Sequence, residues 1–180
     1  GRLCPHPHAR LAGDLPDDQG LSSLFAEIVA LSERLRSSVV DGGTDAGIMR
    51  LVGKAERALE LMCRRVDSRV AFGRKLSEQG SMREAIARSR CDIEQARLLT
   101  LAAADKMDRE GNRGAADLIS MIKIVAPRMC QDVCDRAMQA HGAMGLCQDT
   151  PIPAAFGYGR YVRLADGPEE VHMSQLAKWR

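Results

Sequence analysis

Apolar residues recur at intervals of three and four along most of this chain, and this spacing limits the fold more than any other feature. Four segments carry such a stripe: residues 21–40, 47–70, 81–111 and 114–141. A stripe with this period is the buried face of an amphipathic α-helix, whereas a strand would alternate apolar and polar residues. We find no such alternation. The pattern therefore predicts an all-α protein whose long helices pack antiparallel as an up-and-down bundle.

The predicted helices end at recognisable stop signals, namely Asp41-Gly42-Gly43, Phe72-Gly73, Gly111 and His141-Gly142. The third helix is expected to begin at Ser81, with Glu84 three residues later completing a capping box. Pro127 lies inside the fourth helix and is expected to kink it rather than end it. A turn-rich stretch over 142–153, a short segment and a last helix with Pro168 in its first turn follow.

Charge and composition exclude several classes of function. The chain has 26 basic and 24 acidic side chains, a formal net charge of +2, which is too small to attract a nucleic-acid backbone. Aromatic residues make up 3%, which is too few for base-stacking platforms. No apolar run approaches the roughly 18 residues of a membrane span, and the first residues lack the apolar region of a secretory signal. We therefore expect a soluble, intracellular protein.

The six cysteines give no sign of a disulfide framework or a metal site. Four of them fall inside predicted helices, which favours reduced intracellular thiols. Cys130 and Cys134 lie one helical turn apart, but no second ligand pair follows at the spacing of a zinc site. We therefore predict no bound metal.

Two breaks between the predicted helices carry residues with two possible explanations. In the first, Arg69, Arg74 and Lys75 surround Phe72. Cations complement a helix C-terminus, which is the simpler interpretation, but an arginine there could also bind an anion. In the second, over residues 139–145, spaced glycines either cap a helix or let backbone N–H groups converge on a phosphate.

A third break places a carboxylate, Asp166, directly before Gly167 and the start of the last helix. Asp, Gly, Pro and Glu are the residues that helix starts prefer, so capping alone explains the pattern. A carboxylate tethered outside a helix start can equally act as a positioned general base, because the helix N-terminus keeps it ionised.

Taken in order, these breaks resemble the acyl-CoA dehydrogenase family, in its C-terminal all-helical domain, from about Met49 to Trp179. The matching motifs are Arg69-x-x-Phe72-Gly73-x-x-Leu76, Ile93-Glu94-Gln95-Ala96-Arg97-Leu98-Leu99, Met121-Ile122-Lys123 with Ala126-Pro127, Gln139-Ala140-His141-Gly142-Ala143-x-Gly145, Asp149-x-Pro151 and Leu164-Ala165-Asp166-Gly167-Pro168-x-Glu170-Val171-His172. Each motif is weak, whereas the ordered set is specific. The last motif resembles the subfamily that includes dehydrogenases fused to a kinase-like domain, and their bacterial relatives.

The resemblance implies FAD-dependent α,β-dehydrogenation of an acyl-CoA thioester, in which a carboxylate removes the α-proton and the β-hydrogen leaves as hydride to the flavin. Asp166 falls where the family places that base. Most members have Glu there, whereas Asp is normal in the subfamily that this motif resembles. Gly167 would lie against the thioester, and Pro168, Glu169 and Glu170 would line the flavin.

The first two breaks resemble parts of the family that contact the cofactor across a dimer. Arg69 matches an arginine that reaches the FAD of a neighbouring subunit, and Phe72 would pack beside it. The matching loop consists of Gln139, Ala140, His141, Gly142 and Ala143. The implied partners are an acyl-CoA substrate, further copies of the chain in a dimer or tetramer, and electron-transfer flavoprotein as acceptor. The implied compartment is mitochondrial or peroxisomal in a eukaryote and cytoplasmic in a bacterium.

The resemblance divides the chain in two. Residues 1–46 do not resemble the family and are expected to form an arm and one additional helix from Leu21 to Val40, whereas residues 47–180 form the family domain. The middle domain of the family is missing, and Gly43-Thr44-Asp45 stands where a substrate arginine is expected. We therefore expect the C-terminal portion of a dehydrogenase, inactive on its own. The alternatives are a non-catalytic helical oligomerisation module derived from the family, and an acyl-CoA oxidase that passes electrons to oxygen.

Overall fold

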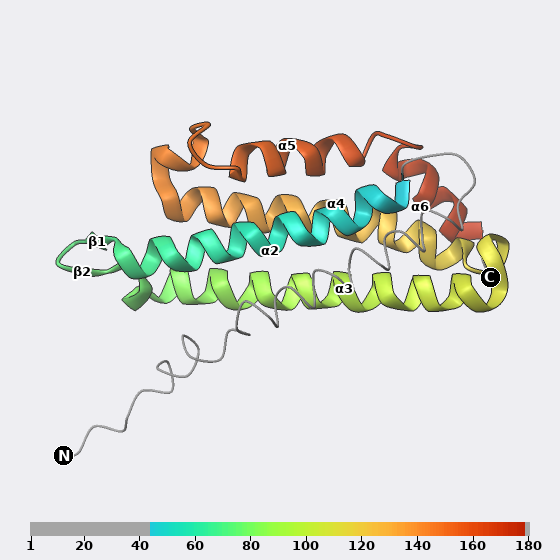
Figure 1. Cartoon of the computed structure of the whole chain (residues 1–180), viewed down its shortest axis with the longest axis horizontal. Helices are drawn as coiled ribbons and strands as arrows, with labels where there is room; N and C mark the ends of the chain where they lie inside the picture. The colour runs from blue at the N-terminus through green and yellow to red at the C-terminus, as the bar shows by residue number, and fades with distance from the viewer. Residues whose placement is uncertain (1–43, 179–180) are drawn as a thin grey trace, which may run out of the picture.

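The computed structural model describes residues 44–178, and this part of the chain contains five α-helices. They are α2 (Thr44–Ser68), α3 (Gly80–Gly114), α4 (Ala116–His141), α5 (Ile152–Val162) and α6 (Glu169–Lys178). Figure 1 shows the three long helices side by side, each running opposite to the one before it. The predicted all-α up-and-down bundle is therefore confirmed. The additional helix predicted from Leu21 to Val40 lies outside the described residues.

The core lies where α2, α3 and α4 meet, because each helix turns its apolar stripe inward. On α2 the stripe predicted from the sequence is buried: Ile48, Leu51, Val52, Ala55, Leu59, Met62 and Val66. Val70, which was expected to continue that stripe, is instead 56% exposed. The reason is that α2 ends at Ser68, two residues before Val70.

A short hairpin follows α2, and it was not predicted. Strands β1 (Val70–Ala71) and β2 (Arg74–Lys75) pair antiparallel. The two residues between them, Phe72 and Gly73, have φ of 55° and 79°, and positive φ at both central residues is the geometry of a tight hairpin turn. The expectation that the chain has no strands is wrong for these four residues, and a one-turn 3₁₀ helix, η2 (Leu76–Glu78), connects them to α3.

Of three helix signals predicted from the sequence, the one at Ser81 is wrong and those at Gly111 and Pro127 match the backbone. The capping box at Ser81 and Glu84 is wrong, because α3 begins one residue earlier, with Gln79 as its N-cap and no side-chain capping bond. The predicted stop at Gly111 coincides with a break in helical geometry, since this residue has a φ of 72° and a ψ of 178° in the last turn of α3. Helix α4 continues through Pro127, as predicted.

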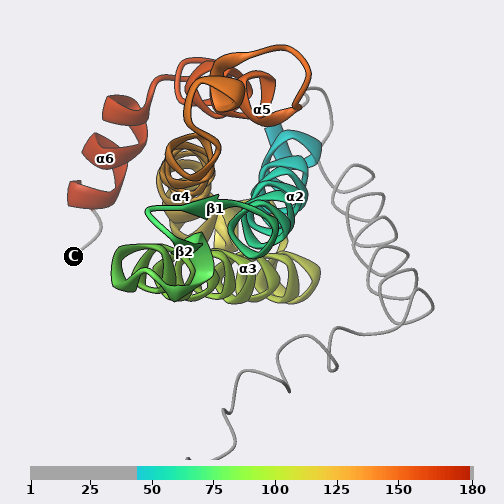
Figure 2. The same cartoon turned by 90° about the vertical axis from the view of Figure 1, so that its left-hand side faces the viewer.

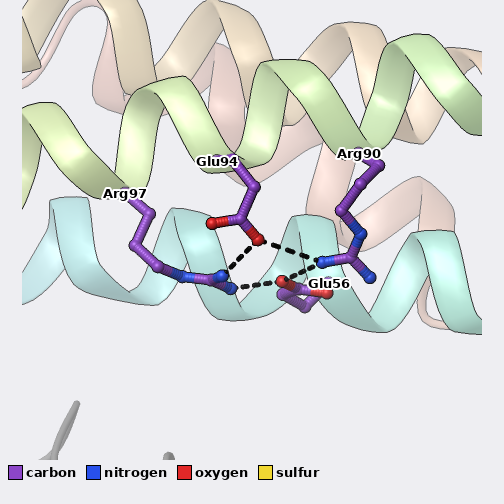
Figure 3. Close-up of polar contacts among 4 residues, drawn as sticks. All are labelled: Glu56, Arg90, Glu94 and Arg97. Atoms are coloured by element: carbon purple, nitrogen blue, oxygen red, sulfur yellow. Dashed lines mark hydrogen bonds and ion pairs between the residues drawn. The ribbon is translucent and has the colours of Figure 1, made fainter. Parts of the chain in front are cut away.

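An ion-pair cluster joins α2 to α3 across their exposed seam (Figure 3). Glu56 on α2 accepts hydrogen bonds from Arg90, at 2.9 Å, and from Arg97, both on α3. Glu94 accepts from the same two arginines, at 3.4 Å and 2.6 Å respectively. Two residues of the motif over 93–99 are therefore used for packing one helix against the next.

Helix α4 occupies the middle of the bundle and packs against α2, α3, α5 and α6 (Figure 2). Helix α5 approaches it closely at Gly159, where an added Cβ would lie 3.0 Å from Cγ of Gln131 and 3.3 Å from the carbonyl oxygen of Pro127. This close approach fixes the direction in which α5 leads into the segment around Asp166.

Among residues 44–178, no helix has the length and apolar character needed to cross a membrane.

Candidate functional site

A cavity of about 440 Å³ lies where α2 and α4 both end. Its lining residues are Arg65, Arg69, Leu76, Gln139, Ala140, His141, Gly142, Ala143 and Met144. The first two predicted breaks, which are seventy residues apart in sequence, therefore form one site. Phe72 is not among the lining residues, because it sits at the tip of the hairpin with 98% of its surface exposed.

Arg65 lines this cavity and is not among the site residues predicted from the sequence. It lies four residues before Arg69, which follows the end of α2 and donates its N–H to the Arg65 carbonyl at 3.0 Å, and both residues line the cavity. Its Nε is buried and has no hydrogen-bond partner among residues 44–178. The i, i+4 spacing of two arginines at a helix end was the available signal, but the missing partner is visible only in the folded chain.

The charge of the cavity favours a negatively charged ligand. Arg65 and Arg69 line it, and none of its lining residues is Asp or Glu. The C-terminal ends of α2 and α4 lie at the same place, and helix C-termini carry partial negative charge. The affinity for an anion must therefore come from the two arginines, whose planar donors match phosphate oxygens.

The segment at the end of α4 is built for close packing rather than for free backbone donors. Gly142 has φ of 66°, and its N–H donates to the carbonyls of Met138 and Gln139. The Nδ1 of the buried His141 donates to the Ala137 carbonyl at 2.8 Å, since a carbonyl can only accept. These groups cap α4 before the 3₁₀ helix η3 (Gly142–Leu146), so they are not available to a phosphate.

The turn between α5 and α6, residues 163–168, carries the candidate base Asp166, and we call it the base turn. Asp166 is exposed and has φ of 54°, and Gly167 has φ of 97°. Pro168 and Glu170 are also exposed. A non-glycine residue in the left-handed region is uncommon and concentrates at functional sites, which makes Asp166 the notable position of this turn.

Glu169 anchors the same turn to the bundle. Its carboxylate is 4% exposed and pairs with Arg163, the residue that follows α5, at 2.7 Å, and with Arg128 of α4. Burial raises the pKa of Glu169, but the hydrogen bonds from Arg163 and Arg128 outweigh it and hold the pKa below its usual range. This carboxylate was expected to line a flavin, and in the described chain it is enclosed by these two arginines.

The ends of α2 and α4, which line the cavity, and the turn between α5 and α6 lie at opposite ends of the bundle (Figure 1). Lys123, which contacts the base turn, and His141, which lines the cavity, are eighteen residues apart on α4. A helix rises about 1.5 Å per residue, so about 27 Å separates the two positions. A general base must lie within hydrogen-bond reach of the proton it removes. One chain therefore cannot use both groups on the same reacting atoms.

The described residues offer no cluster of metal-binding side chains. Among residues 44–178, no group of three or more His, Cys, Asp or Glu side chains lies close enough together to hold a metal ion. Cys130 and Cys134 are both fully buried in α4, where they pack within the core.

Comparison with protein families matches most of the described chain. Residues 46–180 match the model of the acyl-CoA dehydrogenase C-terminal domain. A second model, SLOG in TRPM (prokaryote), matches residues 12–66, so the two matches overlap only at residues 46–66.

Individual relatives give the same result. The probable acyl-CoA dehydrogenase FadE2 of Mycobacterium tuberculosis is 54% identical over 130 residues, which is 72% of this chain and 32% of that protein. Acyl-CoA dehydrogenase family member 10 of Mus musculus is 57% identical over 130 residues, which is 72% of this chain and 12% of that protein. A solved candidate acyl-CoA dehydrogenase from Mycobacterium abscessus is 48% identical with a TM-score of 0.74, covering 76% of this chain and 34% of that one. The chain thus spans about a third or less of the length of these relatives.

Proposed function

Because the chain belongs to the acyl-CoA dehydrogenase family, we propose that it is the helical C-terminal portion of an enzyme that introduces a double bond between the α- and β-carbons of an acyl-CoA thioester. The observation that carries this proposal is the pairing of an exposed carboxylate on a left-handed turn with a separate cationic cavity at the far end of the bundle. Each feature corresponds to one requirement of the reaction.

In this proposal Asp166 is the general base that removes the α-proton. Its exposure leaves it open to a substrate, and a positioned carboxylate is a side chain that can accept a proton as a general base. Gly167 has no side chain to block an approaching thioester, and Pro168 and Glu170 are exposed beside it. The enclosed Glu169 keeps the turn in place through its arginines.

The family resemblance implies an FAD cofactor, which when bound would accept the hydride released from the β-carbon. The cavity residues fit such a cofactor, since the buried, unpartnered Nε of Arg65 and the guanidinium of Arg69 are suited to pyrophosphate oxygens. Leu76, Ala143 and Met144 add apolar surface to the lining. We propose electron-transfer flavoprotein as the acceptor of the electrons, as the resemblance implies.

The separation of the two groups supports an oligomeric site. Because about 27 Å of helix lies between them, the arginines and the base of one chain would serve two different flavins. A second copy of the chain would then bring its own cavity residues to the flavin beside Asp166. This arrangement agrees with the family pattern in which Arg69 and the loop over 139–143 reach across a dimer.

The first test asks whether the chain holds a flavin. The chain is mixed with FAD and separated by size, and the visible flavin spectrum and the oligomer mass are recorded before and after adding an acyl-CoA. A folded oligomer without flavin is expected, because the chain spans a third or less of its relatives. A retained flavin that bleaches with acyl-CoA would instead make the chain an autonomous dehydrogenase.

The second test places residues 46–180 in FadE2 of Mycobacterium tuberculosis, in exchange for the matching segment. In this chimera Asp166→Asn should abolish acyl-CoA-dependent flavin reduction and leave the flavin content unchanged. Arg65→Ala and Arg69→Ala should each weaken FAD binding by roughly tenfold or more, because a hydrogen bond to a charged group contributes about 1.5–3 kcal/mol. Arg64→Ala is the control, since Arg64 pairs with Glu60 and does not line the cavity. Turnover in Asp166→Asn would assign the base elsewhere.

A second candidate function, a helical module that pairs with other subunits without catalysis, is favoured by the exposed apolar residues. Phe72 is 98% exposed, Leu146 is 74% exposed and Leu98 is 64% exposed. Where such residues form a contiguous apolar patch, they mark an interaction surface. A stable oligomer of the chimera that reduces no flavin in any variant would favour this module.

A further inference from the structure

Lys123 is a buried cation that the proposed roles do not use. It lies in the first third of α4 and is 1% exposed, which makes it the largest fully buried side chain of the described residues. Its Nζ donates to the carbonyl oxygen of Ala165 at 2.5 Å. Lysine is almost never fully buried without a compensating interaction, because an ammonium group loses its hydration. A leucine or methionine would fill the same space without that cost, so the amine itself needs an explanation.

The bond from Lys123 acts directly on the turn that carries Asp166. The Ala165 carbonyl belongs to the peptide that joins Ala165 to Asp166, so the orientation of this carbonyl is coupled to φ of Asp166. That φ is 54°, and the next residue, Gly167, has φ of 97°. A left-handed non-glycine residue persists only where the surrounding structure holds it there. The Lys123 donor reaches this peptide from forty-two residues earlier in the sequence, which makes the constraint a tertiary one.

The ring of His172 closes the other side of the same turn. A Cβ added to Gly167 would lie 3.4 Å from Nε2 of His172, so the ring packs against this glycine. Burial lowers the pKa of His172, the backbone of Asp166 partly offsets this, and the positive charge of Lys123 lowers the pKa further. A neutral ring near an ammonium group avoids placing two like charges together. The turn is thus enclosed by α4 on one side and α6 on the other.

We propose that Lys123 is a positioning residue, whose ammonium group holds the Ala165–Asp166 peptide in the left-handed turn that presents the Asp166 carboxylate to substrate. The geometric part of this inference concerns the turn alone. The catalytic part rests on the proposed function, in which Asp166 is the base. Lys123 contacts the backbone of the turn, and it acts on the reaction only by setting where the carboxylate lies.

The geometric part is tested in the 180-residue chain, which needs neither flavin nor substrate for the measurement. Lys123→Met keeps a long, flexible side chain of similar volume and removes the donor. The backbone NMR shifts of Asp166 and Gly167 should leave the values of left-handed residues, and amide exchange over residues 165–169 should accelerate at least about tenfold. The Gly142 amide, at the other end of the bundle, should be unchanged. Left-handed shifts retained at Asp166 and Gly167 would overturn the proposal.

If Lys123→Met does not fold, a second variant tests whether Lys123 holds the turn. Lys123→Leu removes the donor and has a shorter apolar side chain, so it should move the shifts of Asp166 and Gly167 in the same direction as Lys123→Met. Parent-like shifts in this variant would again overturn the proposal.

The catalytic part is tested in the FadE2 chimera. Lys123→Met should lower kcat by about a hundredfold, the effect of a misplacement of about 1 Å, and should change KM for the acyl-CoA less than twofold. Lys106→Met is the control, because Lys106 pairs with Asp117 and does not touch the turn. A parent-like kcat for Lys123→Met, where Asp166→Asn is inactive, would overturn the positioning role. An active Asp166→Asn would instead refute the proposed function, and the NMR shifts would still decide whether Lys123 holds the turn.

Discussion

The packing of α5 on α4 can be tested with two glycines of the same helix. Gly157 is exposed and would meet no atom within 4 Å if it carried a Cβ. Gly159 is buried, and its Cβ would lie 3.0 Å from Cγ of Gln131 and 3.3 Å from the carbonyl oxygen of Pro127. Replacing each by alanine changes the helix propensity equally, so the difference between the two variants measures the contact alone.

The expected magnitudes follow from these distances. Alanine is about 1 kcal/mol more favourable than glycine in a helix interior, so Gly157→Ala should raise the free energy of unfolding by roughly that amount. Gly159→Ala gains the same propensity but must displace its neighbours. Gln131 is 8% exposed and accepts a hydrogen bond from Arg163 at 3.0 Å, so it has little freedom to move. Overpacking of this kind costs about 1–3 kcal/mol, and the two variants should differ by about 2 kcal/mol.

Urea unfolding followed by circular dichroism measures both variants. A gap of about 2 kcal/mol corresponds to roughly 4–8 °C in melting temperature for a chain of this size. The double variant Gly159→Ala with Gln131→Ala should be more stable than the two single effects predict, because the smaller side chain leaves room for the new methyl group. Equal stabilisation by Gly157→Ala and Gly159→Ala would refute the close approach of α5 to α4.

Three further predictions follow from individual side chains. Glu169→Gln should destabilise the fold by about 2–3 kcal/mol at pH 7, because it removes the charge that two arginines enclose. The pKa of Glu169 is held low in the folded chain. The charged carboxylate therefore stabilises the fold fully above the unfolded pKa of about 4.3, and this stabilisation is lost as the pH falls through the folded pKa. Urea unfolding at several pH values should show the free energies of unfolding of variant and parent converging at low pH. Gly145→Ala should destabilise by about 1–3 kcal/mol in calorimetry, because its Cβ would lie 2.6 Å from the Met138 carbonyl oxygen. Phe72→Ser should leave the stability within about 0.5 kcal/mol, because the ring is 98% exposed, and should lower the oligomer mass measured by light scattering.

Each of these predictions has a result that contradicts it. A constant difference between Glu169→Gln and the parent from pH 7 to pH 3 would mean that the charge of this residue does not stabilise the fold. Gly53 on α2 is the reference for Gly145, since a Cβ there would meet nothing within 4 Å. Equal effects of alanine at the two positions would disprove the backbone contact. An unchanged oligomer mass for Phe72→Ser would exclude the hairpin tip from the interface.

The long helices could be predicted because their signal is local. A stripe of apolar residues at helical spacing must face a core wherever that core lies, and the buried residues of α2 follow the predicted stripe as far as Val66. The hairpin after α2 could not be predicted in this way, because strands of two residues are too short to show an alternation. The antiparallel pairing of β1 with β2 and the positive φ values of Phe72 and Gly73 define it, and both are visible only in the folded chain.

The directions of the helices decide which of the predicted site residues lie together. Arg69 and the loop over 139–143 come together because α2 and α4 run in the same direction and end at the same place. Asp166 lies at the other end, because α5 returns along the bundle before the base turn. Arg65 looked like an ordinary surface cation until the cavity beside it was visible. The roles of these residues toward a flavin or a substrate remain predictions.

The sequence by itself determined which segments are helical, which of their faces are buried and which motifs the chain shares with its family, because helix periodicity and motif order are properties of neighbouring residues. The tertiary structure decided which motifs share a site. It brought two arginines and the end of α4 around one cavity, placed the candidate base about 27 Å away along α4, and buried Lys123 against the turn that holds it. Distances between residues far apart in sequence depend on helix direction and packing, and no local pattern encodes them.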